Sequence, residues 1–113
     1  NQAVTRISNA LIEIRTDLLL FCSIVLILLY FSAVGIYLFE NEAQPEIFSS
    51  IPAAMWWAVA TLTTVGYGDA YPITTGGKIF TSIITILGIG IIAIPTGLIS
   101  AALTRSKNKD DLD

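Results

Sequence analysis

Six residues beginning at Thr64 read Thr-Val-Gly-Tyr-Gly-Asp, with two glycines alternating with two bulky side chains. In an ordinary strand, successive residues face opposite sides. Glycine adopts left-handed backbone conformations at low cost, so Gly66 and Gly68 allow the carbonyls from Thr64 to Tyr67 to face one side. We then expect Val65 and Tyr67 to turn their side chains away, into packing. Stacked rings of such oxygens, with the Thr64 hydroxyl as a further layer, can replace the water shell of a dehydrated monovalent cation.

The segment before this motif predicts a helix that is too short to cross a membrane. Residues 51–62 read IPAAMWWAVATL, and Ser50 is a candidate cap before Pro52 in the first turn. A helix over 50–63 would reach about 20 Å at ~1.5 Å per residue, well short of a ~30 Å hydrocarbon core. The pattern is typical of a re-entrant helix. A helix packed on the outer surface is the alternative, which the adjacent tryptophans disfavour.

Two runs without any charge, 18–39 and 79–103, flank this short helix and its motif. About 20 apolar residues are enough for a helix to cross a bilayer. A buried helix of a soluble core is the alternative, but so short a chain could not bury two helices that are apolar on all sides. The sequence therefore predicts an outer membrane helix over 18–40 and an inner membrane helix over 77–104.

The composition agrees with a membrane protein and disfavours other classes. Of 113 residues, 54% are hydrophobic and 13% charged, against roughly 25% charged in an ordinary soluble domain. The net charge of −3 gives no basic patch for nucleic acid. The absence of histidine and the single cysteine, Cys22, argue against an enzyme, a zinc site or an internal disulfide.

An oligomer is expected because of the irregular backbone of the motif. Non-helical backbone at membrane depth is tolerated only where it is buried in protein or lines a water-filled path. Two membrane helices of one chain cannot enclose such a segment, whereas several copies of the chain can.

The two ends of the chain predict its orientation and its cytoplasmic parts. Five of the six Lys and Arg residues lie outside the two apolar runs at the termini, and only Lys78 lies between the runs, so both termini are expected in the cytoplasm. Residues 1–17 have an amphipathic pattern, which predicts an interfacial helix or a plain lead-in to the first membrane helix. Residues 105–113 predict a polar cytoplasmic tail that frays.

The stretch 48–72 resembles the pore loop of potassium channels, and it is most similar to the voltage-gated type. The resemblance continues through Gly77, Lys78 and Ile79 and covers most of residues 18–104. It implies an all-α membrane protein in which two transmembrane helices flank a re-entrant pore helix and an extended selectivity filter. It also implies a homotetramer in the lipid bilayer of a bacterial cell, with K⁺ as the transported ion.

The resemblance also implies roles for individual residues. The selectivity filter would span 64–68, and the backbone carbonyls of 64–67 would coordinate K⁺. Trp56 would donate a hydrogen bond to the Asp69 carboxylate, Trp57 and Tyr67 would belong to an aromatic cuff behind the filter, and Glu40 would brace the outer mouth. The implied K⁺ ligands are Thr64, Val65, Gly66 and Tyr67, and the implied supporting residues are Gly68, Asp69, Trp56, Trp57 and Glu40.

The sequence departs from related channels at two places. Some bacterial two-span channels have a glutamate behind the filter where this chain has Ala60, which puts that style of filter inactivation in doubt. Animal voltage-gated channels often have Pro-x-Pro near the gate, where this chain has Pro95-Thr96-Gly97. A proline inside a helix removes a hydrogen bond and predicts a kink. The candidate cavity and gate residues are Thr85, Gly88, Ile92, Pro95, Thr96 and Gly97, with small-residue helix packing as the alternative at Gly88.

Other functions stay open at this stage. They are a nonselective cation channel, a subunit of a transporter, and a membrane subunit that only binds a partner; the intact Tyr67-Gly68 pair disfavours the first. A voltage sensor needs several cations at three-residue spacing, and only Arg6 and Arg15 precede the first apolar run. We therefore expect any sensor to lie upstream in a longer parent chain, or the chain to be a self-contained two-span channel with another stimulus.

Overall fold

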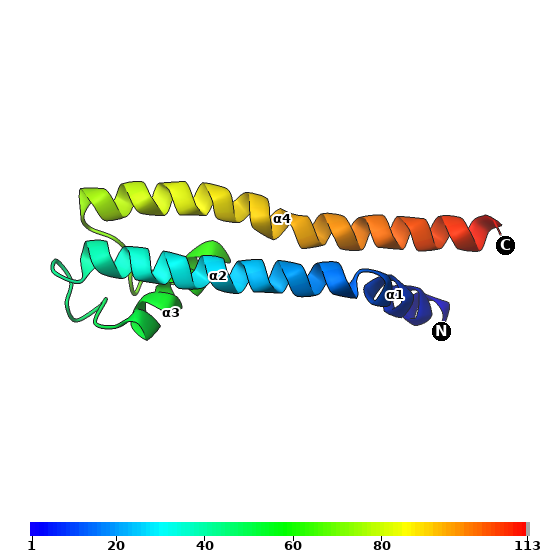
Figure 1. Cartoon of the computed structure of the whole chain (residues 1–113), viewed down its shortest axis with the longest axis horizontal. Helices are drawn as coiled ribbons and strands as arrows, with labels where there is room; N and C mark the ends of the chain where they lie inside the picture. The colour runs from blue at the N-terminus through cyan, green and yellow to red at the C-terminus, as the bar shows by residue number, and fades with distance from the viewer. Residues whose placement is uncertain (113) are drawn as a thin grey trace. The chain divides into compact units, whose positions relative to one another are not determined.

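The computed structural model describes residues 1–112, without the side chains of residues 106 and 109–112. These residues form four α helices and no strand, which confirms the all-α prediction (Figure 1). The chain divides into two compact units, one formed by 25–91 and one by 1–24 with the described residues from Ile92 onward. Helices α2 and α4 contribute residues to both units, and each unit is described separately below.

Two helices are long and apolar enough to cross a membrane. Helix α2 spans Arg15–Glu40, and its most apolar 18-residue stretch has a mean hydropathy of 2.6. The most apolar 18-residue stretch of the Thr75–Arg105 part of α4 has a mean hydropathy of 2.2. Helix α2 begins three residues earlier than predicted. Helix α4 spans Thr75–Leu112, so it continues through the segment 105–112 that was expected to fray. The predicted end of the inner helix at residue 104 is therefore wrong within the described residues, because charged residues can extend a helix already formed.

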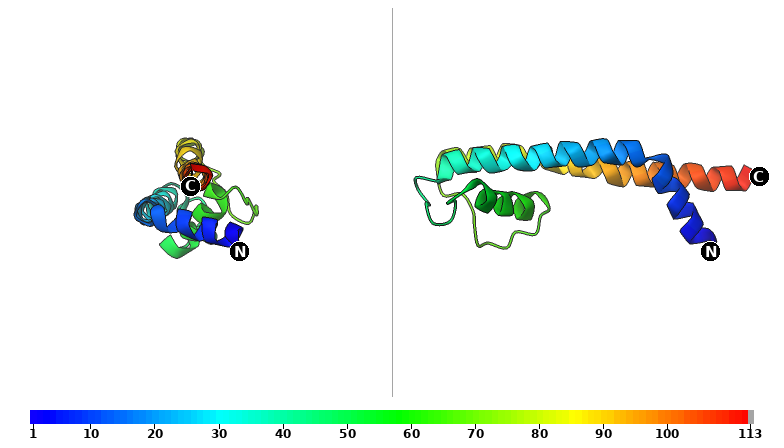
Figure 2. Two further views of the ribbon diagram at one scale, coloured as in Figure 1. Left: turned by 90° about the vertical axis from the view of Figure 1, so that its right-hand side faces the viewer. Right: turned by 60° about the horizontal axis from the view of Figure 1, so that its bottom comes forward.

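The short helix α3 spans Ile51–Leu62 and ends one residue inside each predicted bound. The Ser50 side chain caps it by accepting from the Ala53 amide at 3.2 Å, and Pro52 occupies the first turn, where its missing N–H costs nothing. Thr63 ends the helix. The chain then returns as irregular backbone, which Figure 2 shows as the loop between α3 and α4.

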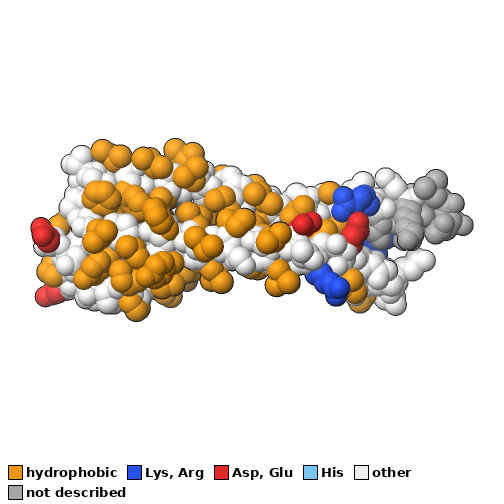
Figure 3. All heavy atoms as spheres, viewed as in Figure 1, with side chains coloured by type: hydrophobic (Ala, Val, Ile, Leu, Met, Phe, Trp, Pro, Cys, Tyr) orange, Lys and Arg blue, Asp and Glu red, His pale blue; other side chains and the backbone are white. Residues whose placement is uncertain are grey.

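The core of the 25–91 unit lies where α3 meets α2 and α4. Trp57 of α3 is 2% exposed and packs edge-on against Phe48, with ring centroids 6.1 Å apart. The cluster is buried although most apolar side chains of this unit stay on the outside, as the orange surface in Figure 3 illustrates. The buried members are Ala33, Ile36, Phe48, Ala54, Trp57, Ala58 and Ile84.

Helices α2 and α4 approach each other through two aromatic rings that lie against glycines. An added Cβ at Gly35 would lie 2.1 Å from the Phe80 ring, and one at Gly76 would lie 2.7 Å from the Phe39 ring. The rings of Phe39 and Phe80 also contact each other, with centroids 5.5 Å apart. A side chain at either glycine would overlap the facing ring, so these contacts fix how α2 and α4 pack within this unit.

The other unit joins the two ends of the chain. Helix α1 spans Gln2–Glu13, capped by the Asn1 side chain, and ends at Ile14 before α2 begins at Arg15. The predicted helix over 1–17 is therefore two helices with a break between them. Ala10 and Ile14 are buried against Ala102 of α4, and the described side chains of Glu13 and Arg105 form an exposed ion pair at 3.0 Å.

Candidate functional site

The motif that begins at Thr64 is attached to the carboxyl end of α3 by backbone hydrogen bonds. The amides of Val65 and Gly66 both donate to the Ala60 carbonyl, at 2.9 and 3.1 Å, and the Thr64 amide donates to the Thr61 carbonyl at 3.1 Å. Carbonyls in the last turn of a helix have no partner within the helix. The motif supplies partners for two of them, so the position of its inner end is fixed by α3.

Every second residue of the motif has a positive φ. The values are +60° at Gly66, +86° at Gly68 and +65° at Thr64. The two glycines are the positions at which the sequence predicts left-handed backbone. Thr64 was not predicted, because a β-branched side chain disfavours this conformation. Its hydroxyl donates to the Thr63 carbonyl at 2.6 Å, a local bond that sequence spacing alone does not reveal.

The outer end of the motif is held by Trp56 of α3. The Trp56 indole Nε1 donates to Asp69 Oδ2 at 2.8 Å, the hydrogen bond that the resemblance implies. The Trp56 ring also stacks on Tyr67, with centroids 5.4 Å apart and planes at 8°. One side chain therefore contacts both an aromatic and an acidic residue of the motif.

Within a single chain, Tyr67 and Trp57 do not contact each other as the predicted aromatic cuff would suggest. Tyr67 stacks on Trp56, whereas Trp57 lies in the core against Phe48. The side chains of Val65 and Tyr67 are 53% and 64% exposed, so the expected packing behind the motif is incomplete within one chain. An apolar surface of this kind next to exposed backbone is typical of a site that another chain covers.

Glu40, the last residue of α2, connects α2 to the segment that leads into α4. Its carboxylate is fully buried and accepts from the Ile73 amide at 2.5 Å and from the amide and hydroxyl of Thr74. The Gln44 side chain donates to the same carboxylate at 2.8 Å and to the Tyr71 carbonyl at 2.9 Å. A buried carboxylate is costly unless several donors bind it. The donors at Ile73 and Thr74 are therefore held close to Glu40, and this fixes the position of the segment between the motif and α4.

Sequence reasoning missed the partners of Glu40 and the glycines beneath the aromatic rings. Thr74 lies 34 residues from Glu40, so no spacing rule connects them, whereas Gln44 lies four residues after Glu40 and could have been suspected from the i, i+4 rule. Gly35 and Gly76 could have been suspected from the rule that small residues allow helices to approach closely in membranes. That rule names candidate positions, but it does not identify Phe80 and Phe39 as their partners.

The predicted cavity and gate positions lie along α4, divided between the two units. In the 25–91 unit, the Thr85 hydroxyl donates to the Thr81 carbonyl at 2.8 Å. Gly88 is buried, and an added Cβ would lie 2.6 Å from Leu62 of α3, which is the packing alternative for this glycine. In the other unit, α4 continues unbroken through Pro95, and Gly97 has open space around it. Ile92 is half-buried and Thr96 exposed.

Comparison with known proteins supplies a family match. The family model described as "Ion channel" matches residues 19–105. A cyclic nucleotide-gated potassium channel of Rhizobium etli is 39% identical over 85 residues, which are 75% of this chain and 24% of the relative. Human potassium voltage-gated channel subfamily A member 6 is 49% identical over 82 residues, 73% of this chain and 15% of the relative.

A third relative shows a similar identity and coverage. Mouse potassium voltage-gated channel subfamily A member 5 is 51% identical over 82 residues, which cover 73% of this chain and 13% of that protein. The chain thus spans a quarter or less of the length of these relatives. The family match over 19–105 includes all of α3 and the motif and most of α2 and α4.

Proposed function

The chain belongs to the ion channel family, and we propose that it forms the pore of a tetrameric, potassium-selective channel that conducts K⁺ passively across a membrane. Four copies would surround one axis, each supplying one filter segment. The observation on which the proposal depends is the alternation of positive φ at Thr64, Gly66 and Gly68 in a segment attached to a half-length apolar helix.

The filter chemistry follows from that alternation. Carbonyls from Thr64 to Tyr67 would form stacked rings of four oxygens, and the Thr64 hydroxyl would add a layer at the inner end. Carbonyl dipoles replace the hydration shell of K⁺ without the strong binding that a ring of carboxylates would give. The exposed side chains of Val65 and Tyr67 would be covered by neighbouring copies, which supports an oligomer rather than a monomer.

We infer that both termini lie in the cytoplasm of a bacterial cell, with the 40–78 segment on the outer side of the membrane. The distribution of Lys and Arg supports this orientation, because positive residues remain on the cytoplasmic side during insertion. The segment outside contains Glu42 and Glu46, whose charges would raise the local concentration of cations at the outer mouth.

Gating is proposed at the inner helix. Pro95 cannot donate to the Ile91 carbonyl, and Gly97 has no side chain to restrict bending, so α4 has a weak point beyond Ile92. Opening would splay the inner helices there, with Thr85 and Thr96 along the conduction path, whereas Gly88 packs against Leu62 of α3. Single-channel recording of Pro95→Ala would test this: we expect an altered open probability, and an unchanged one would remove the reason for a hinge at Pro95.

The stimulus is proposed to come from a voltage sensor elsewhere in a longer parent chain, to which α1 would be the link. The much greater length of the relatives supports this. The alternative is a self-contained two-span channel opened by another stimulus. Sequencing the parent gene upstream of the codon for Asn1 distinguishes the two, since only a longer parent chain would encode a helix with several Lys or Arg residues at three-residue spacing there.

Selectivity is tested by the reversal potential of the purified protein in planar bilayers under a K⁺/Na⁺ gradient. A potassium-selective pore should reverse near the K⁺ equilibrium potential, and Tyr67→Val, which keeps an apolar side chain without the contact to Trp56, provides a comparison. A reversal potential near zero for the unmodified chain would instead support a nonselective cation channel.

A further inference from the structure

A close contact between α3 and α4 lies directly before the inner end of the motif. Gly88 of α4 is buried, and a Cβ added to it would lie 2.6 Å from Leu62 Cδ2 and 3.8 Å from Leu62 Cγ. Leu62 is the last residue of α3, and its side chain is only 5% exposed. The Leu62 side chain therefore fills the space that a side chain at residue 88 would need, and it packs on the bare backbone of α4.

This contact continues a longer interface between the two helices. On α3, Ala54, Ala58 and Leu62 are buried and follow one another at four-residue spacing, so they share one face. On α4, Ile84 and Gly88 are buried at the same spacing. Ala54, Ala58 and Ile84 belong to one core cluster, so Leu62 and Gly88 extend that packing by one helical turn toward the motif.

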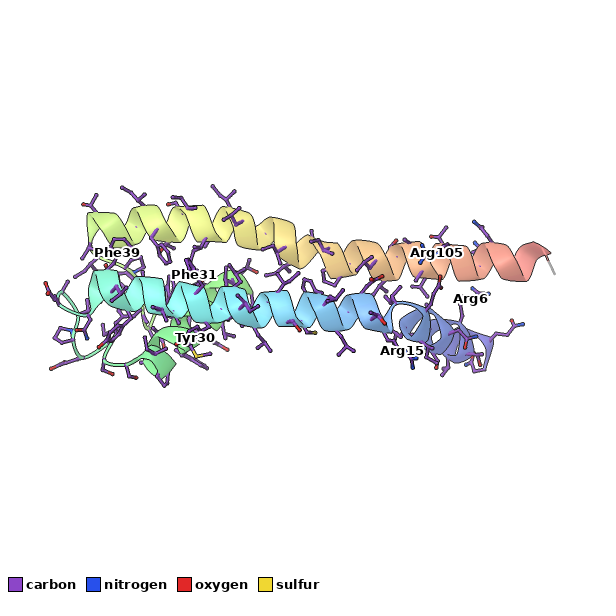
Figure 4. The ribbon with its side chains drawn as sticks, in the orientation of Figure 1. Arg6, Arg15, Tyr30, Phe31, Phe39 and Arg105 are labelled. Atoms are coloured by element: carbon purple, nitrogen blue, oxygen red, sulfur yellow. The ribbon has the colours of Figure 1, made fainter. Side chains whose placement is uncertain are left out.

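Helix α2 holds the outer end of the same part of α4. The ring of Phe39, labelled at the outer end of α2 in Figure 4, lies 2.7 Å from the position that a Cβ of Gly76 would take. Within the 25–91 unit, α4 is thus fixed at Gly76 by α2 and at Gly88 by α3. Gly90, by contrast, has open space around it. The missing side chain of Gly88 therefore serves close packing rather than bending.

Leu62 also belongs to the turn of α3 that holds the motif. The carbonyls of Ala60 and Thr61, the two residues before it, accept hydrogen bonds from three amides of the motif at 2.9 to 3.1 Å. A shift of the Leu62 side chain would move this turn, and the hydrogen-bonded inner end of the motif would move with it. Selection of K⁺ by carbonyl rings depends on the cavity size and on the number and strength of the carbonyl dipoles. The packing of Leu62 on Gly88 is therefore in a position to affect ion selection.

We propose that Leu62 is a positioning residue for the selectivity of the filter. Its side chain, packed on the bare backbone at Gly88, fixes the last turn of α3 against α4. The filter amides that are hydrogen-bonded to this turn then hold the inner carbonyls at the spacing that favours K⁺ over Na⁺. Leu62 acts through the backbone and does not bind the ion itself. This role rests on the function proposed above, because it requires filter segments from four copies around one axis.

The reversal potential of the purified chain in planar bilayers under a K⁺/Na⁺ gradient tests this role. Gly88→Ala forces a methyl group into the Leu62 side chain. Overpacking of this kind shifts an equilibrium by about tenfold, and we expect the filter to take up the strain, so the K⁺/Na⁺ permeability ratio should fall by about that factor. Adding Leu62→Ala removes the overlap and should return the ratio to within about threefold of that of the unmodified chain.

Gly90→Ala is the matched control. It adds the same methyl group two residues further along α4, where the chain leaves open space, and it changes helix propensity by the same amount. The permeability ratio of Gly90→Ala should stay within about twofold of that of the unmodified chain. Leu62→Ala should not restore anything in this background, because Gly90 does not contact Leu62.

Two results would overturn the role of Leu62. Equal permeability ratios for Gly88→Ala and Gly90→Ala would mean that the overlap with Leu62 does not reach the filter. Equal losses for Gly88→Ala with and without Leu62→Ala would mean that the two residues act independently. If native mass spectrometry shows that Gly88→Ala does not assemble, Leu62→Ala alone decides. It removes atoms and leaves a cavity beside Gly88, so the ratio should fall, and an unchanged ratio would overturn the proposal.

The unmodified chain separates this proposal from the proposed function. A reversal potential near zero for the unmodified chain would overturn both the potassium-selective pore and the role of Leu62. A selective unmodified chain whose Leu62 and Gly88 variants keep that selectivity would overturn the role of Leu62 alone.

Discussion

Replacing the buried Glu40 carboxylate should be the most damaging single change to the outer half of the chain. The carboxylate is fully buried and accepts from Ile73, Thr74 and Gln44. Glu40→Ala would leave two backbone amides and one hydroxyl without an acceptor. At roughly 1–3 kcal/mol for each buried unsatisfied group, offset in part by the desolvation cost that the charge itself no longer incurs, we expect a net loss of about 4 kcal/mol.

Glu40→Gln gives a finer test of the same reasoning. The glutamine side chain keeps the shape and one acceptor oxygen. Its NH₂ group would replace the second carboxylate oxygen, so two donors would face each other where a hydrogen bond now forms. We expect a loss of about 2–3 kcal/mol, because hydrogen bonds to charged groups are worth more than neutral ones. Glu42→Gln is the matched control, since Glu42 is exposed.

The assay is equilibrium unfolding of the purified chain by denaturant in mild detergent, followed by tryptophan fluorescence. Both tryptophans lie on α3, in the same unit as Glu40, so their signal reports on the affected region. The expected order of stability is the unmodified chain and Glu42→Gln, then Glu40→Gln, then Glu40→Ala. A Glu40→Gln stability within about 0.5 kcal/mol of the Glu42→Gln control would refute the argument, since that is the ordinary size of a surface substitution.

Three further substitutions test other parts of the structure. Trp56→Phe keeps an aromatic ring but loses the 2.8 Å hydrogen bond to Asp69, so thermal unfolding should show a loss of stability of about 1–2 kcal/mol. A double-mutant cycle with Asp69→Asn should show that the two losses are not additive. Additive losses would mean that the hydrogen bond contributes nothing to stability. Gly35→Ala places a Cβ 2.1 Å from the Phe80 ring and should lower stability by about 1–3 kcal/mol. Combining it with Phe80→Leu should restore part of that stability. Equal losses with and without Phe80→Leu would contradict the packing argument. Gly66 has open space for a Cβ but a φ of +60°, so Gly66→Ala should lower stability by about 1–2 kcal/mol. The reversal potential should also show weaker selectivity for K⁺. Unchanged selectivity would exclude a role for this backbone conformation in the filter.

The helices and the motif could be predicted from the sequence because their signals are local. Two charge-free runs identify the membrane helices, Ser50 and Pro52 mark the start of α3, and alternating glycines indicate left-handed backbone at Gly66 and Gly68. The end of α4 could not be predicted in this way. A charged segment has no apolar pattern to favour either a helix or a frayed tail, although an existing helix extends into it easily.

The sequence by itself therefore determined the element types, the family resemblance and the residues of the motif, since each depends on periodicity or on a few adjacent residues. Only the tertiary structure decided which distant residues meet, such as Glu40 with Thr74 and Gly35 with Phe80. These contacts join residues 34 and 45 positions apart, and side-chain spacing along one helix carries no information about the partner that packs against it.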